Sequence, residues 1–94
     1  MENKPEEHFV YILKCADGTL YTGYARDVKK RVSEHNGKSK IEGAKYTRSR
    51  RPVKLLYSEE FTSRSDAQQR EYAIKQLSRP QKQQLIKISK LSAQ

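Results

Sequence analysis

The sequence predicts an α/β fold of the α+β type, a small three-stranded antiparallel sheet flanked by helices in the order β-β-α-β-α-α. Residues 8–15, 19–24 and 53–61 are rich in aromatic and β-branched side chains, which favours three strands. Helix-type patterns with capping residues follow the second and third of these runs. With 94 residues there is room for one domain with a modest core. We expect residues 1–7 to form a flexible tail and residues 8–94 the domain.

The first two strands are joined by residues 16–18, Ala-Asp-Gly, which is a hairpin signal. A two-residue loop would send Tyr11 and Tyr21 to opposite faces. A three-residue loop with Gly18 in the left-handed conformation pairs Tyr11 with Gly23 and puts both tyrosines on one face. We predict the three-residue loop. Gly23 would then leave open space beside Tyr11, where two phenols could hold a small anion.

A helix is expected directly after the hairpin. Asp27 is a good N-cap, and Val28 and Val32 give the helix an apolar edge. At 100° per residue, His35 lies about 20° and Arg31 about 60° from Val28, so both point toward the sheet. Taken alone, these two residues would be interpreted as a snorkelling arginine and a hydrogen-bonded boundary histidine.

The motifs considered together resemble the core of the GIY-YIG endonucleases. The resemblance rests on their order and spacing: Phe9-Val10-Tyr11, Tyr21-Thr22-Gly23, the helix start from Asp27 to Arg31, and His35. It spans about residues 8 to 80 and looks closest to the small stand-alone bacterial members. The sequence departs from the family pattern at Phe9 and Thr22, which replace a glycine and an isoleucine. Tyr24 stands where the repair-nuclease branch has a lysine, a role that Arg26 could take.

The second half of the chain adds one strand and two helices. Strand 53–61 should place Val53, Leu55 and Tyr57 on one face and Leu56 on the other. Ser63 followed by Asp66 resembles a capping box and predicts a helix that ends at about Leu77. A last helix has Pro80 in its first turn. Its expected apolar side consists of Leu85, Ile86, Ile88 and Leu91.

Glu71 falls within the apolar stripe of the first of these two helices, between Ala67 and Ile74. A carboxylate aimed at the interior needs a cation, because burying an unpaired charge costs several kcal/mol, on the order of a lost ion pair. One interpretation is a salt bridge to Arg31 or Arg70. The other is a metal site, and the resemblance places the family's metal-binding glutamate on Glu71. The implied cofactor is Mg²⁺ (or Mn²⁺), which keeps much of its hydration shell beside a single carboxylate.

Residues 36–52 form a basic stretch that is either a solvated loop or a segment that grips phosphates. Tyr46 favours the second interpretation, since an aromatic ring among cations can stack on an unpaired base. We expect the nucleic-acid contacts to come from this stretch and from the hairpin: Gly23, Arg26, Lys45, Tyr46, Arg48, Arg50 and Arg51.

Composition points to a nucleic-acid partner. Lys and Arg number 20 against 11 acidic residues, for a net charge of +9, which suits a polyanion. The single cysteine, Cys15, excludes an internal disulfide, fits a cytoplasmic protein, and is expected in the core rather than as a nucleophile. No run is long enough to span a membrane. We expect a monomer that binds DNA, with RNA not excluded and a protein partner possible.

The function implied by the resemblance is a metal-dependent endonuclease that hydrolyses DNA phosphodiester bonds, guided by DNA structure and acting in repair or recombination. The implied roles are metal binding by Glu71, phosphate neutralisation by Arg31, and proton acceptance or orientation by His35. Tyr11 and Tyr21 would flank the water and the phosphate, and the sequence leaves open which is the general base. Two alternatives are a nucleic-acid-binding module with weak or no catalysis, and a subunit that cleaves only with a partner.

Overall fold

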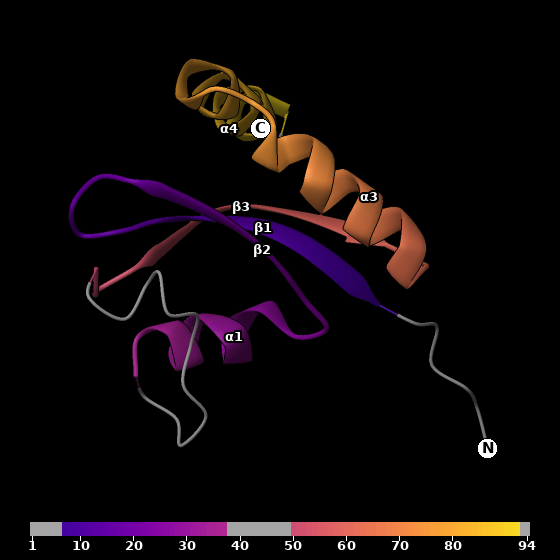
Figure 1. Ribbon diagram of the computed structural model, residues 1–94, viewed down its shortest axis with the longest axis horizontal. Coiled ribbons are helices and arrows are strands. Elements are labelled where there is room, and N and C mark those ends of the chain that lie inside the picture. The colour runs from indigo at the N-terminus through magenta and orange to yellow at the C-terminus, as the bar shows by residue number, and fades with distance from the viewer. Residues whose placement is uncertain (1–6, 38–49, 93–94) are drawn as a thin grey trace.

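The computed structural model describes residues 7–37 and 50–92, and their helices and strands follow the predicted order. They are β1 (His8–Lys14), β2 (Leu20–Ala25), α1 (Val28–His35), β3 (Lys54–Phe61), α3 (Arg64–Lys75) and α4 (Arg79–Ser92). The strands form one antiparallel sheet in the order β2-β1-β3, so β1 is central. Helix α1 covers one face of the sheet, and α3 and α4 lie on the other side (Figure 1). The predicted fold class is confirmed.

The β1–β2 hairpin has the predicted three-residue loop. Gly18 has a φ of 86°, and the amide of Cys15 donates to the carbonyl of Thr19 over 2.9 Å. The register pairs Tyr11 with Gly23. The same register pairs Tyr21 with Leu13, which lies two residues after Tyr11. Paired residues and residues two apart on a strand share a face, so Tyr11 and Tyr21 lie on the same side of the sheet, as predicted.

Two apolar clusters fill the space on the two faces of the sheet. The α3 and α4 side is built on Val10, Ile12, Tyr57, Ala67, Ile74 and Ile86. The α1 side is built on Tyr11, Leu13, Cys15, Ala25 and Val53, with Tyr21, Val28 and Val32 packed against it. Cys15 is a buried free thiol, in agreement with its expected core position. Among the helices described, none is both long and apolar enough to cross a membrane.

The predicted alternation of β3 is wrong because of a β-bulge. Ile12 pairs with Tyr57 but the next residue, Leu13, pairs with Leu55, so the register shifts at this point. An extra residue reverses the side-chain alternation of a strand. Val53 therefore joins the α1-side cluster and Tyr57 the opposite one.

The helix caps agree with the sequence, whereas two helix details do not. Asp27 accepts a hydrogen bond from the Lys30 amide at 3.0 Å, and Ser63 accepts one from the Asp66 amide at 3.1 Å. Helix α3 ends at Lys75 rather than near residue 77. On α4, the Ile88 side chain is 50% exposed instead of packed against the domain. The predicted packing of the residue 91 side chain lies outside the described residues.

Candidate active site

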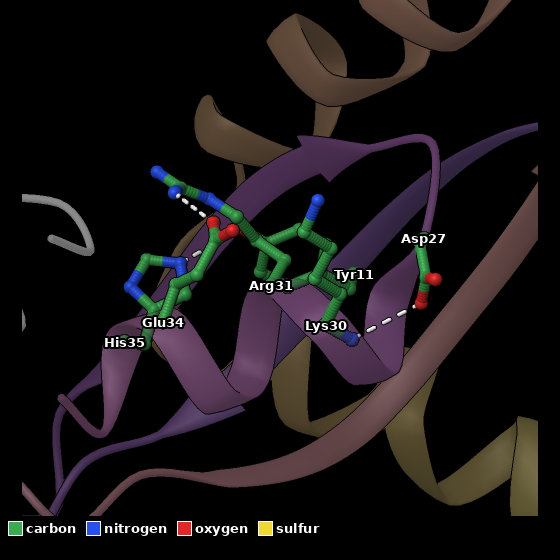
Figure 2. Close-up of polar contacts among 6 residues, drawn as sticks. All are labelled: Tyr11, Asp27, Lys30, Arg31, Glu34 and His35. Atoms are coloured by element: carbon green, nitrogen blue, oxygen red, sulfur yellow. Dashed lines mark hydrogen bonds and ion pairs between the residues drawn. The ribbon is translucent and has the colours of Figure 1, made fainter. Parts of the chain in front are cut away.

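Tyr11, Tyr21 and His35 meet between the hairpin and α1. The phenol oxygen of Tyr11 and Nε2 of His35 form a hydrogen bond of 2.9 Å (Figure 2). The imidazole of His35 also contacts the ring of Tyr21 edge-on, with the two ring centroids 5.2 Å apart. The centroids of the His35 and Tyr11 rings are 5.9 Å apart. His35 is fully buried, since it projects from the last turn of α1 against the sheet. One histidine thus contacts both tyrosines of the predicted catalytic set.

The space over Gly23 is filled by the Tyr11 ring. A Cβ atom built on Gly23 would overlap the phenol oxygen and Cζ of Tyr11. The prediction of open space there, with a small anion between two phenols, is therefore wrong. Gly23 instead allows the phenol to pass close beneath the β2 backbone, which a side chain at this position would prevent.

Burial sets the protonation states of the hydrogen-bonded pair. It raises the pKa of Tyr11 to about 12, with the Tyr21 and Glu71 charges acting in the same direction and Arg31 opposing them. It also lowers the pKa of His35 to about 4, and Arg31 contributes to that shift. Both groups are therefore neutral at pH 7. The Glu71 carboxylate on α3 is the smallest of these contributions to the pKa of Tyr11.

Arg31 is held by a residue that the sequence analysis overlooked. Its Nη1 donates to Oε1 of Glu34 over 2.7 Å, within one turn of α1 (Figure 2). Burial disfavours the charged guanidinium, but Glu34 and Tyr11 outweigh this effect and raise the pKa of Arg31. The Glu34 side chain is 7% exposed and the Arg31 side chain 29%, so the carboxylate of this pair is shielded from water while the guanidinium is partly accessible. The i,i+3 spacing is visible in the sequence, but the burial follows from the packing of α1 on the sheet.

Glu71 lies on α3 within the stripe formed by Ala67 and Ile74, and its side chain is 20% exposed. Its Oε2 pairs with Nζ of Lys75 at 3.0 Å. Neither arginine considered from the sequence is paired with it in the described ion pairs: Arg31 pairs with Glu34, and Arg70 pairs with Glu59. In the described part of the chain, no three His, Cys, Asp or Glu side chains gather as a metal-binding group.

The predicted nucleic-acid contacts are distributed along the fold. Nε of Arg26 donates to the Glu7 carbonyl at 2.6 Å, and Nε of Arg50 lies 2.9 Å from Oδ2 of Asp17 in the hairpin loop. Nε of Arg51 donates to the His35 carbonyl at 2.6 Å. These arginines thus make contacts within the protein itself. The other predicted contacts of the basic stretch lie outside the described residues: Lys45, Tyr46 and Arg48.

Asn36 was also overlooked. Its side chain makes two hydrogen bonds with the backbone of Val53, accepting from the amide at 2.7 Å and donating to the carbonyl at 3.2 Å. This contact joins the end of α1 to the start of β3 and supports His35 from the following residue. An asparagine after a helix is a common sequence feature, so the pattern alone did not distinguish it.

Comparison with known proteins identifies the class of domain. The GIY-YIG catalytic domain family matches residues 7–84. The chain therefore belongs to the GIY-YIG family, and it resembles the small single-domain members.

Particular relatives are similar over most of the chain. A UPF0213 protein of Desulfotalea psychrophila is 58% identical over 81 residues, which cover 86% of this chain and 72% of the relative. One from Halobacterium salinarum is 58% identical over 79 residues, or 84% of this chain and 99% of the relative. The solution structure of protein EF2693 from E. faecalis is 45% identical, with a TM-score of 0.62 over 97% of this chain and 93% of that one.

Proposed function

We propose that this protein is a metal-dependent endonuclease that hydrolyses DNA phosphodiester bonds, guided by DNA structure rather than sequence, in DNA repair or recombination. The observation that carries the proposal is the buried hydrogen bond between Tyr11 and His35, beside Arg31. Membership of the GIY-YIG family supports nuclease chemistry. A net charge of +9 supports a nucleic acid as the substrate.

Glu71 fits a Mg²⁺ site of the kind that uses one carboxylate. It is partly exposed, the side chain of its partner Lys75 is half-exposed, and its charge contributes to the raised pKa of Tyr11. Mg²⁺ keeps several waters and is often bound by one or two carboxylates together with substrate phosphates. When bound, the cation would supply charge neutralisation on the phosphate and acidify a bound water.

The chain's own residues supply phosphate binding and proton transfer. Arg31 presents a guanidinium that binds a non-bridging phosphate oxygen. We assign the general base to Tyr11, because its oxygen is hydrogen-bonded directly to His35. The attacking water gives its proton to the Tyr11 oxygen while the Tyr11 proton passes to Nε2 of His35. This transfer avoids a free phenolate on Tyr11, which a pKa of about 12 disfavours at pH 7.

The proton transfer also depends on the charges around His35. Burial is the main reason that its pKa is low, Arg31 and Arg51 lower this pKa further, and Glu34 raises it. A phosphate that pairs with Arg31 reduces the repulsion between that guanidinium and a protonated imidazole. Substrate binding thus removes part of the electrostatic opposition to a protonated His35, whereas burial and both arginines keep it neutral in the free protein.

The decisive experiment is single-turnover cleavage of branched, nicked and linear DNA, and of RNA, with Mg²⁺ or with EDTA. The wild-type protein should cut a branched or nicked DNA only with Mg²⁺. Tyr11→Phe should lower the rate at saturating DNA by about 10²-fold or more, as expected for the loss of a general base. DNA affinity should be unchanged, since phosphate binding is assigned to Arg31 and the Tyr11 hydroxyl carries no charge.

Tyr57→Phe is the matched control, because it removes the hydroxyl of another buried tyrosine, one that belongs to the cluster on the opposite face of the sheet and donates to Glu59. This variant should cut as fast as wild type. Equal rates for wild type and Tyr11→Phe would overturn the role of Tyr11. Binding without any Mg²⁺-dependent cleavage on all substrates would favour a binding module.

A further inference from the structure

A small pocket opens between the end of β2 and the first turns of α1. Its volume is about 220 Å³, equivalent to about seven water molecules in the liquid. A phosphate group with part of its hydration shell fits such a volume. The side chains that give the pocket its character are Tyr24, Arg26, Asp27, Lys30, Arg31 and Glu34.

The charged groups of this pocket differ in whether they already have an ion-pair or hydrogen-bond partner within the protein. Asp27 caps α1 through the Lys30 amide, and Glu34 holds Arg31. Within residues 7–37 and 50–92, the ammonium of Lys30 is exposed and has no ion-pair partner. The pocket therefore has three cations with different partners: Lys30 has no ion-pair partner among the described residues, Arg31 is bound by the Glu34 carboxylate, and Arg26 donates from Nε to the Glu7 carbonyl.

Lys30, Arg31 and Glu34 leave the same side of α1. At 100° per residue they span about 100° of the helix surface, and Figure 2 shows the three side chains on one flank of the helix. Glu34 is 6% exposed, so its charge depends on Arg31 for compensation. A carboxylate and a phosphate are recognised by a guanidinium in the same way. Glu34 thus occupies a place on Arg31 that suits a phosphate oxygen.

We propose that this pocket is a subsite for a second phosphate group of the DNA strand, next to the scissile one. Lys30 and Arg31 bind this phosphate, and Glu34 is the internal anion that competes with it for Arg31. The inference rests on the proposed function, because Arg31 serves both the subsite and the reacting phosphate. Neutralising Glu34 should therefore strengthen DNA binding, although the side chain lies in the active site.

The test measures binding of a single-stranded oligonucleotide of six thymidines by fluorescence anisotropy, in EDTA so that no cleavage occurs. Lys30→Gln should raise Kd by roughly tenfold, as for the loss of a charge-assisted contact. Lys29→Gln is the matched control, since Lys29 is also exposed and adjacent but lines a different pocket. This control should change Kd by no more than about twofold, as a screened distant charge does. Equal effects of the two variants would overturn the subsite.

Glu34→Gln supplies the sharper test. It should lower Kd by roughly threefold or more, and in an Arg31→Gln background it should have no further effect, because competition requires the guanidinium. If Glu34→Gln lowers Kd equally in the wild-type and Arg31→Gln backgrounds, the effect comes from weaker repulsion between the protein and the DNA. Competition between Glu34 and the phosphate for Arg31 is then refuted. A higher Kd for Glu34→Gln would mean that the residue only positions Arg31. A thermal melt of each variant confirms that it is folded.

The subsite and the proposed function fail differently. If the affinity pattern appears but no DNA is cut with Mg²⁺, the nuclease proposal fails and the phosphate subsite stands. If DNA is cut with Mg²⁺ while Lys29→Gln and Lys30→Gln bind alike, the nuclease proposal stands and the subsite fails.

Discussion

The phenol oxygen of Tyr11 and Nε2 of His35 lie 2.9 Å apart, although 24 residues separate them in the chain. The contact forms because β1 and the last turn of α1 face each other across the smaller apolar cluster. It connects the central strand to the helix that carries Arg31. Changes that disturb this contact should affect stability and catalysis in separable ways.

Acid should destabilise the protein through His35. Burial lowers its folded pKa to about 4 from 6.5, so between these values the unfolded chain binds a proton that the folded state excludes. Stability is unaffected above pH 6.5 and falls as the pH drops toward 4, by on the order of 3 kcal/mol. Urea unfolding in EDTA from pH 7 to pH 4 measures this loss. His35→Gln should reduce the slope, and parallel curves for the two proteins would contradict the assignment.

Glu71→Gln should abolish cleavage, with a rate at least about 10²-fold lower, because a neutral amide is a poor Mg²⁺ ligand. The fold should persist, since the change conserves volume at a partly exposed position. Single-turnover rates and thermal melts test both statements. A Glu71→Gln protein that melts higher and still cuts DNA would show that the residue is only an ion-pair partner.

Lys75→Gln should have the opposite effect on the same site. The Lys75 ammonium lies 3.0 Å from the Glu71 carboxylate and competes with a divalent cation for it. Its removal should reduce the Mg²⁺ concentration that gives half the maximal rate. A titration of the cleavage rate with Mg²⁺ gives this half-maximal concentration for both proteins. A higher concentration for Lys75→Gln than for wild type would contradict the prediction.

Alanine at two hairpin glycines should have different consequences. Gly18→Ala adds a Cβ that meets no atom within 4 Å but requires a φ of 86°, so it should cost about 1 kcal/mol and leave the rate intact. Gly23→Ala collides with the Tyr11 phenol and should displace it from His35. Cleavage should then fall as in Tyr11→Phe. Unfolding free energies and single-turnover rates, compared for the two variants, decide whether the close approach at Gly23 matters for catalysis.

Thr22→Val should stabilise the protein. Thr22 is 3% exposed, and among the described residues its hydroxyl has no hydrogen-bond partner. Valine has nearly the same shape and removes the cost of a buried unsatisfied hydroxyl, so the free energy of unfolding should rise by about 1 kcal/mol. Thr19→Val is the control: its hydroxyl donates to Asp17 over 2.6 Å, so this variant should not be stabilised. A destabilised Thr22→Val would indicate that the hydroxyl is satisfied in solution.

Local chemistry made the hairpin and the caps predictable. Gly18 can adopt positive φ at no steric cost, and this sets the loop length and thus the face on which Tyr11 and Tyr21 lie. Asp27 and Ser63 satisfy amides within their own helices. These features depend on residues close in the sequence, and the same holds for the order of strands and helices.

Features that depend on packing were not predictable in the same way. The bulge in β3 breaks the assumed alternation, and no glycine or proline marks it. The choice of Lys75 as the partner of Glu71, and of Glu34 as the partner of Arg31, depends on side-chain positions in the folded state. The space over Gly23 appeared open because the strand register gives the positions of the backbones only. It does not show that the Tyr11 ring lies over Gly23.

The central position of β1 determines how the active site can move. Among the three described strands, β1 is the one that is hydrogen-bonded on both sides, and it carries Tyr11. The backbone of Tyr11 can therefore exchange its amide hydrogen with solvent only when the sheet itself opens. The amides around Tyr11 should be among the slowest to exchange, whereas those of the eight-residue α1 exchange faster. Heat or denaturant should therefore not loosen Tyr11, the proposed base, before the protein unfolds, and any motion during substrate binding should come from the helix that carries Arg31.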